Sequence, residues 1–166
     1  FGRMAMNDYE TAALVAGGHT FGKSHGAAPE SHKGPEPEGS KIYEQSTGWN
    51  SNYKSGKGVD TISSGIEGAW TQNPIKWDMG YLDCLYDHDW ELTKSPAGAH
   101  QWTPKRNGQK IKMVPDAHVK GKMHPPMMQT TDISLKVDPS YGPITRHFHK
   151  NPEAVSYTHL RAHETT

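Results

Sequence analysis

A chain of 166 residues is long enough for one domain, but with only 33% hydrophobic residues, 17 glycines and 12 prolines it is too polar to bury a large core alone. Its 18 basic and 18 acidic residues cancel, which excludes nucleic acid or an anionic membrane as a partner held by long-range charge. The single cysteine, Cys84, excludes an internal disulfide and a multi-cysteine zinc site, and favours a reducing compartment. No apolar run approaches the roughly 18 residues of a membrane span, and no signal peptide is recognisable.

The first predicted helix begins after Asn7. Asn7 can cap it, and Glu10, three residues later, completes a capping box. An apolar face at helical spacing is formed by Tyr9, Ala12, Ala13 and Ala16. Gly17 and Gly18 are expected to end the helix, so His19 should lie at its exit, beside alanines small enough to let a flat group pack closely.

The middle of the chain is predicted to be mostly irregular. Residues 26–60 are rich in Gly, Pro, Ser and Lys without any period, which is typical of a long surface loop. The stretch 61–71 is short and is interrupted by glycines, which favours an extended segment that another group approaches closely. A second helix is predicted from the helical spacing of Trp77, Tyr81, Leu82 and Leu85.

The last part of the chain combines a hairpin with two helices. Residues 90–94 and 100–103 flank the turn sequence SPAGA, which predicts a β-hairpin, and residues 104–126 read as loop. Thr131 can cap a short helix through Val137, and Asp138-Pro139 is a typical helix start whose apolar face follows at Tyr141, Ile144 and Phe148. There is no internal repeat. The sequence therefore predicts a mainly α-helical fold with one small β-hairpin and long loops.

Three scattered residues are candidates for chemistry: His19 at a helix exit, Trp70 on a glycine-rich segment and Asp132 at a helix start. Each has a simpler interpretation when taken alone. A histidine after a helix is most often solvated or capping, a tryptophan is most often packed in a core, and an aspartate in a first helical turn favours the helix dipole.

The residues around these three change that interpretation. Residues 17–26 (GGHTFGKSHG) closely resemble the proximal-histidine motif of catalase-peroxidases. Stretches similar to the same family follow in the same order at residues 4–8 (MAMND), 64–70 (SGIEGAW) and 131–135 (TDISL). The similarity runs from Phe1 to about Ala154. It implies the proximal half of a helical haem-peroxidase domain over residues 1–154, from a bifunctional bacterial enzyme that dismutates hydrogen peroxide and oxidises small organic donors.

The resemblance also implies roles for the three candidates. His19 would be the axial ligand of the iron of haem b, and Asp132 would accept the proton of the other ring nitrogen and raise the basicity of the ligand. A carboxylate has two acceptor oxygens, so the second oxygen of Asp132 is expected to accept the indole N–H of Trp70. Trp70 would then be placed to pass an electron.

Further residues take roles by the same resemblance. Met4 matches a methionine that the family crosslinks to a tyrosine and a tryptophan, an adduct associated with catalase activity; read alone, Met4 is a flexible core filler. Ser64 matches a position lining the substrate approach to the haem edge, although an ordinary turn serine remains an alternative. Gly22, Lys23 and His25 are expected on the cofactor side of the motif.

Alternatives to a catalase-peroxidase remain open. A single-activity relative, such as cytochrome c peroxidase or ascorbate peroxidase, shares the histidine, tryptophan and aspartate but has a much shorter connection than the 70 − 19 = 51 residues between His19 and Trp70. A different class is a non-enzymatic metal-binding module, suggested by 11 histidines that nevertheless lack ligand spacing. A third alternative is a partly folded remnant with no activity of its own.

The chain departs from the family pattern at two places. A peroxidase needs an arginine, a tryptophan and a histidine on the distal side of the haem, and no motif for them is found, so the fragment alone is expected to be inactive. After Ala154 the family continues differently, and residues 155–166 are interpreted as a foreign, artefactual tail that does not belong to the domain. The resemblance implies a cytoplasmic bacterial parent, with a periplasmic variant open, assembled as a homodimer or homotetramer.

Overall fold

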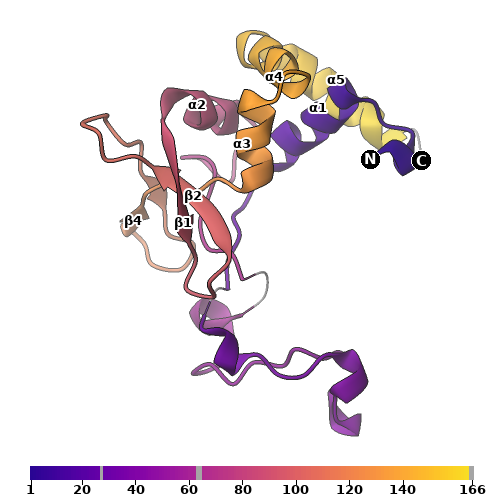
Figure 1. Cartoon of the computed structure of the whole chain (residues 1–166), viewed down its shortest axis with the longest axis vertical. Helices are drawn as coiled ribbons and strands as arrows, with labels where there is room; N and C mark the ends of the chain where they lie inside the picture. Colours follow the sequence, from indigo (N-terminus) through magenta and orange to yellow (C-terminus); the bar gives the residue numbers. More distant parts are fainter. Residues whose placement is uncertain (27, 63–64, 165–166) are drawn as a thin grey trace.

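The computed structural model describes residues 1–26, 28–62 and 65–164 as a mainly helical molecule (Figure 1). Its α-helices are α1 (Asp8–Gly18), α2 (Gly80–Asp87), α3 (Thr130–Val137), α4 (Tyr141–Lys150) and α5 (Pro152–Glu164). Its strands are β1 (Trp90–Lys94), β2 (His100–Pro104), β3 (Val114–Pro115) and β4 (Met123–His124). Short 3-10 turns occupy Gly2–Met4, Glu30–His32, Pro37–Gly39, Ile42–Glu44 and Gly58–Asp60. Across the described ranges, no helix has both the length and the apolar character needed to cross a membrane.

The helices pack around α1 and α4. α1 lies against α4 and α5, while α3 connects α4 to α2 and to the strand β2. Four apolar side chains at this junction are almost completely buried: Ala12, Ala13, Leu82 and Phe148. The predicted capping box of α1 is confirmed, because the N–H of Glu10 donates to Asn7 Oδ1 (2.9 Å) and the N–H of Asn7 donates to Glu10 Oε2 (3.0 Å). The helix ends at Gly18, as the glycine pair predicts.

The second helix starts later than the sequence predicts. α2 begins at Gly80, whose N–H donates to Asp78 Oδ1 (2.8 Å), so Trp77 lies outside it. Tyr81, Leu82 and Leu85 are buried on its inner face, as predicted. Cys84 is 2% exposed on the same helix, and burial raises the pKa of its thiol to about 12.

The predicted hairpin is confirmed, and a second small ladder accompanies it. β1 and β2 pair antiparallel, from Trp90 opposite Pro104 to Lys94 opposite His100. Within the region predicted as loop, β3 and β4 form a two-residue antiparallel ladder. Such short strands leave no hydrophobic alternation to detect. Both ladders lie on the side of α3 opposite to α1 (Figure 1).

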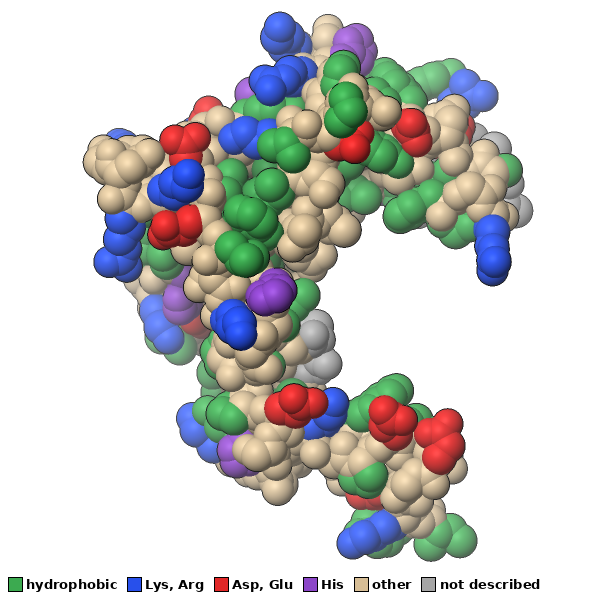
Figure 2. All heavy atoms as spheres, in the orientation of Figure 1, with side chains coloured by type: hydrophobic (Ala, Val, Ile, Leu, Met, Phe, Trp, Pro, Cys, Tyr) green, Lys and Arg blue, Asp and Glu red, His purple; other side chains and the backbone are tan. Residues whose placement is uncertain are grey.

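Residues 29–60, the arm, extend away from the helices (Figure 1). They contain 3-10 turns but no longer element, as expected for a long surface loop. Figure 2 shows an open hollow between the arm and the helical part of the molecule. The arm connects the segment that follows His19 to the segment that carries Trp70.

The proposed domain boundary at residue 154 falls inside α5. Val155 is fully buried, and Ser156 Oγ accepts the indole N–H of Trp77 (2.9 Å). His159 Nδ1 lies 3.2 Å from the carbonyl oxygen of Ala13 on α1. A Cβ atom at Gly17 would overlap the His159 ring, so a glycine there permits the close approach of α5 to α1. Residues 155–161 therefore take part in the packing of this fold.

Candidate functional site

The structure brings the three candidate residues together from distant parts of the chain. His19 is the C-cap residue of α1, Trp70 lies on the extended segment after the arm, and Asp132 belongs to the first turn of α3. The imidazole of His19 stacks on the indole of Trp70, with ring centroids 4.0 Å apart and planes inclined by 21°. His19 Nε2 lies 3.1 Å from Asp132 Oδ1. We call these three residues the His–Trp–Asp cluster.

Asp132 is completely buried, and its two oxygens have different partners. Oδ2 accepts the backbone N–H of Gln129 (2.7 Å), which caps α3. Oδ1 accepts the hydroxyl of Tyr81 (2.9 Å), a residue of α2. Burial, together with the negative charge of Asp132, holds the pKa of Tyr81 well above its usual value, so this hydroxyl keeps its proton and remains a donor.

The expected hydrogen bond from Trp70 to Asp132 is not present. The helix cap and the Tyr81 hydroxyl occupy the two carboxylate oxygens, and the buried indole N–H of Trp70 has no hydrogen-bond partner among the described residues. The prediction failed because it assigned both oxygens to rings and left out the backbone N–H that begins α3. Trp70 is held beside His19 by ring stacking instead.

The contact between His19 and Asp132 is close but not aligned as a hydrogen bond. The distance of 3.1 Å from Nε2 to Oδ1 is that of an ion pair. Yet Nε2 is buried and lacks a hydrogen-bond partner of suitable geometry in the part of the chain that the structure describes. A buried polar atom without such a partner is uncommon and calls for a structural or functional reason.

Sequence reasoning missed Tyr81 as a member of this site. It was assigned only to the apolar face of a helix, whereas its ring meets that of His19 edge-on, at 5.1 Å and 74°. One signal could have identified it: a tyrosine on a buried helical face must find a partner for its hydroxyl, and buried acceptors are few.

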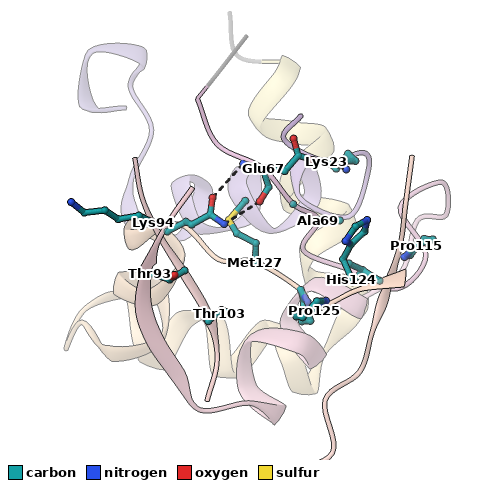
Figure 3. A pocket seen from close by; sticks show the side chains of 14 residues that line it. Lys23, Glu67, Ala69, Thr93, Lys94, Thr103, Pro115, His124, Pro125 and Met127 are labelled. Atoms are coloured by element: carbon teal, nitrogen blue, oxygen red, sulfur yellow. Dashed lines mark hydrogen bonds and ion pairs between the residues drawn. The ribbon is translucent and has the colours of Figure 1, made fainter. Parts of the chain in front are cut away.

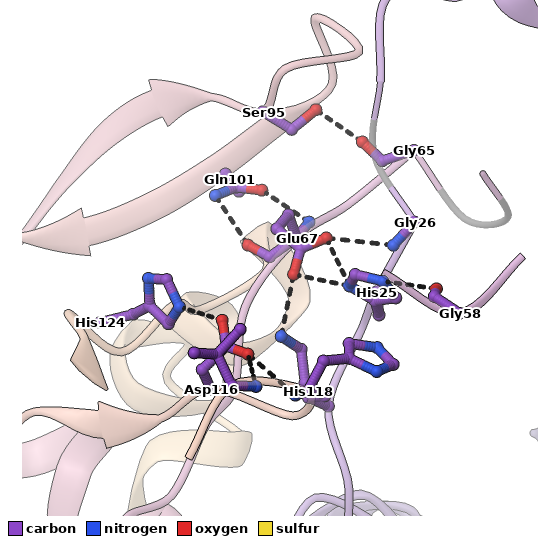
Figure 4. A network of polar contacts seen from close by, with 12 residues as sticks. His25, Gly26, Gly58, Gly65, Glu67, Ser95, Gln101, Asp116, His118 and His124 are labelled. Atoms are coloured by element: carbon purple, nitrogen blue, oxygen red, sulfur yellow. Dashed lines mark hydrogen bonds and ion pairs between the residues drawn. The ribbon is translucent and has the colours of Figure 1, made fainter. Parts of the chain in front are cut away.

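Lys23 and His25 belong to a second group of polar contacts, shown in Figure 4. Lys23 Nζ lies 2.9 Å from a carboxylate oxygen of Glu67, and His25 Nδ1 lies 3.0 Å from the same carboxylate. The N–H of Gly26 also donates to Glu67 (3.0 Å). Burial raises the pKa of Glu67, but the bonds from His25, Lys23 and Gly26 outweigh it, and the net shift is downward. These contacts fasten the chain after His19 to the segment before Trp70.

A cavity of about 270 Å³ lies next to this second group. Figure 3 shows Lys23, Glu67 and Met127 at one side of it and Thr93 and Thr103 of the hairpin at the other. Neither His19 nor Asp132 lines it. The cavity is therefore a neighbour of the His–Trp–Asp cluster and not part of it.

The remaining candidates have separate locations. Gly22 adopts a left-handed backbone (φ 67°), which favours glycine, and its N–H donates to the carbonyl oxygen of Pro74 (2.7 Å). Met4 lies in the first 3-10 turn and is 48% exposed, so it is not the core filler that it resembles when read alone. Ser64 lies outside the described residues.

The histidines do not support the alternative of a metal-binding module. In residues 1–26, 28–62 and 65–164, no three His, Cys, Asp or Glu side chains gather in a way that could hold a metal ion. Some of the described histidines each lie against one carboxylate instead, for example His124 against Asp116 (2.6 Å) and His149 against Asp83 (2.8 Å).

Comparisons with known proteins give one consistent family. A family model described as peroxidase matches residues 1–151. The chain is 64% identical to a catalase-peroxidase of Koribacter versatilis over 92% of its own length and 20% of that protein. It is 58% identical to one of Gloeobacter violaceus and 60% identical to one of Maridesulfovibrio salexigens, each over 98% of this chain and 22% of the relative. The chain thus spans about a fifth of the length of these relatives. With a family model matching most of its residues, the chain belongs to the peroxidase family.

Proposed function

We propose that this chain forms the proximal side of the haem site in a bifunctional catalase-peroxidase, with His19 as the axial ligand of the iron. The observation that carries the proposal is the His–Trp–Asp cluster, in which Trp70 and Asp132 are buried and which is assembled from three segments that are far apart in the sequence. The names of the similar proteins support the same activity.

The residues present fit a haem group. His19 Nε2 lies 3.1 Å from Asp132 Oδ1, so the metal would be held through the other ring nitrogen, Nδ1. An imidazole can hold a metal through one nitrogen and face a carboxylate through the other. When bound, haem would supply the redox chemistry by which hydrogen peroxide is reduced and oxidised.

The protein residues would then have separate tasks. Asp132 would orient the His19 ring and increase its electron donation, since a carboxylate near the far ring nitrogen raises the basicity of a ligand histidine. Trp70, stacked 4.0 Å from His19, would be the side chain placed to carry an electron between the cofactor and the protein. Lys23 and His25, through Glu67, would hold the loop that follows His19 in place, and Gly22 would provide its left-handed turn.

Several finer assignments belong to the same proposal. The cofactor would be haem b, and the substrates would be hydrogen peroxide and small organic electron donors. Met4 would join the covalent adduct of the family, and Ser64 would line the substrate approach. The parent protein would be a homodimer or homotetramer of the bacterial cytoplasm or periplasm. The 51 residues from His19 to Trp70, and the arm they form, favour this family over single-activity peroxidases.

A haem titration of the purified chain tests the proposal. We expect one equivalent of haem to bind with the Soret band of a histidine-ligated iron, and zinc not to compete. Retention of zinc without uptake of haem would instead support a metal-binding module.

The peroxide turnover of the haem-loaded chain is a separate prediction. We expect little or none, because His19, Trp70 and Asp132 act on the proximal side, and deprotonation of peroxide needs a base on the opposite side. Oxygen release from hydrogen peroxide measures the rate. A robust haem-dependent catalase rate from this chain would contradict the expectation.

A further inference from the structure

Tyr81 contacts both the histidine and the aspartate of the His–Trp–Asp cluster. Its hydroxyl donates to Asp132 Oδ1 at 2.9 Å, and its ring meets the His19 ring edge-on at 5.1 Å. Both partners of the hydrogen bond are removed from solvent, since Tyr81 is 1% and Asp132 0% exposed. A hydrogen bond to a charged acceptor in such surroundings is stronger than the same bond in water.

The hydroxyl competes with His19 for one oxygen. Oδ2 of Asp132 is engaged by the cap of α3, so Oδ1 is the carboxylate oxygen that faces the rings. That oxygen lies 2.9 Å from the Tyr81 hydroxyl and 3.1 Å from His19 Nε2. Only the hydroxyl is aligned as a donor, because Nε2 has no hydrogen-bond partner among the described residues.

We propose that Tyr81 is a positioning residue that sets how strongly Asp132 acts on His19. By donating to Oδ1, its hydroxyl partly neutralises the carboxylate oxygen that His19 faces. Asp132 then acts on the His19 ring less strongly than a carboxylate with a free Oδ1 would. The effect on iron rests on the proposed function, whereas the effect on the His19 ring does not.

The chain offers a matched control on the same helix. Tyr86 also carries a hydroxyl with a defined partner, Thr145 Oγ1 at 2.7 Å, and its ring stacks on His149 instead of His19. Tyr81→Phe and Tyr86→Phe therefore each remove one hydrogen-bonding hydroxyl from α2 and keep the aromatic ring. Only the first change alters the surroundings of Asp132.

The first measurement needs no haem. We expect Tyr81→Phe to shift the ring 15N resonances of His19 at a fixed neutral pH, as its bond to Asp132 strengthens, and Tyr86→Phe to leave them unchanged. In an Asp132→Asn background the shift caused by Tyr81→Phe should disappear. Unchanged His19 resonances in Tyr81→Phe would overturn the inference. If Tyr81→Phe does not fold, difluorotyrosine at position 81 replaces it as the test. Its hydroxyl is a stronger hydrogen-bond donor, so it should shift the same His19 resonances in the opposite direction. The absence of any shift in that variant would also overturn the inference.

The second measurement uses the haem-loaded chain. Tyr81→Phe should move the reduction potential of the iron to a more negative value, because stronger interaction of a ligand imidazole with a carboxylate stabilises the oxidised metal. Tyr86→Phe should keep the wild-type potential. An identical potential in Tyr81→Phe would overturn the inference although haem binds. Failure of the wild-type chain to take up haem would refute the proposed function and leave the nitrogen resonances as the independent test of Tyr81.

Discussion

Replacement of His19 by alanine is expected to abolish the histidine-ligated haem spectrum of the chain and to weaken haem binding by about 100-fold or more, beyond the loss typical of residues that only support a ligand. The reason is that His19 would supply the one bond from the protein to the iron. The measurement is a haem titration followed by the Soret band.

The fold should survive this change. The backbone N–H of His19 bonds to Val15 and closes α1 whatever the side chain is, and the side chain of His19 is 19% exposed. His147→Ala is the matched control, because His147 is exposed on α4 and contacts Tyr9 instead of the cluster. A Soret band that is the same in His19→Ala and in the wild type would refute His19 as the ligand.

Asp132→Asn is expected to lower haem affinity about 10- to 100-fold, the usual cost of removing the carboxylate behind a ligand histidine. The side chain keeps its shape but loses its charge, so His19 becomes less basic and the reduction potential of the iron should rise. Titration and potentiometry of the haem-loaded chain measure the two effects.

The two carboxylate oxygens of Asp132 accept the Tyr81 hydroxyl and the Gln129 N–H, and Asp132→Asn replaces one of these oxygens by an amide nitrogen. The lost acceptor should lower the free energy of unfolding by roughly 1 kcal/mol. Asp138→Asn separates that cost from the haem effect. Asp138 follows α3 as its C-cap residue, and its Oδ1 accepts the N–H groups of Ser140 and Tyr141 instead of a donor from the His–Trp–Asp cluster. Haem affinity and potential should stay at wild-type values in Asp138→Asn. If they also stay there in Asp132→Asn, the proposed role of Asp132 is wrong.

The elements that the sequence predicted well are those fixed by local chemistry. The capping box of Asn7 and Glu10 sets the start of α1, and the glycine pair sets its end. The hairpin follows from a turn sequence between two strand-forming runs. Each of these signals acts within a few residues, so no knowledge of distant contacts is needed.

The features that the sequence did not predict depend on distant contacts. Trp77 has the spacing of a helical residue, but its indole bonds to Ser156 and it stays outside α2. The pairing of β3 with β4 involves two residues on each strand, too few for a pattern. The partners of Asp132 were assigned from a resemblance, and the actual donors, Tyr81 and the Gln129 backbone, become neighbours only when α2 packs on α3. The spacing of apolar residues along the sequence cannot show that the Tyr81 hydroxyl and the His19 ring face the same oxygen of Asp132.

The burial of Cys84 has a consequence for chemical damage. Thiols react with oxidants and alkylating reagents as thiolates, and a thiol with a pKa of about 12 is almost never ionised at neutral pH. The only sulfhydryl of the chain is thus spared from sulfenic acid formation while α2 stays docked. Its modification by iodoacetamide would therefore track transient opening of the protein interior.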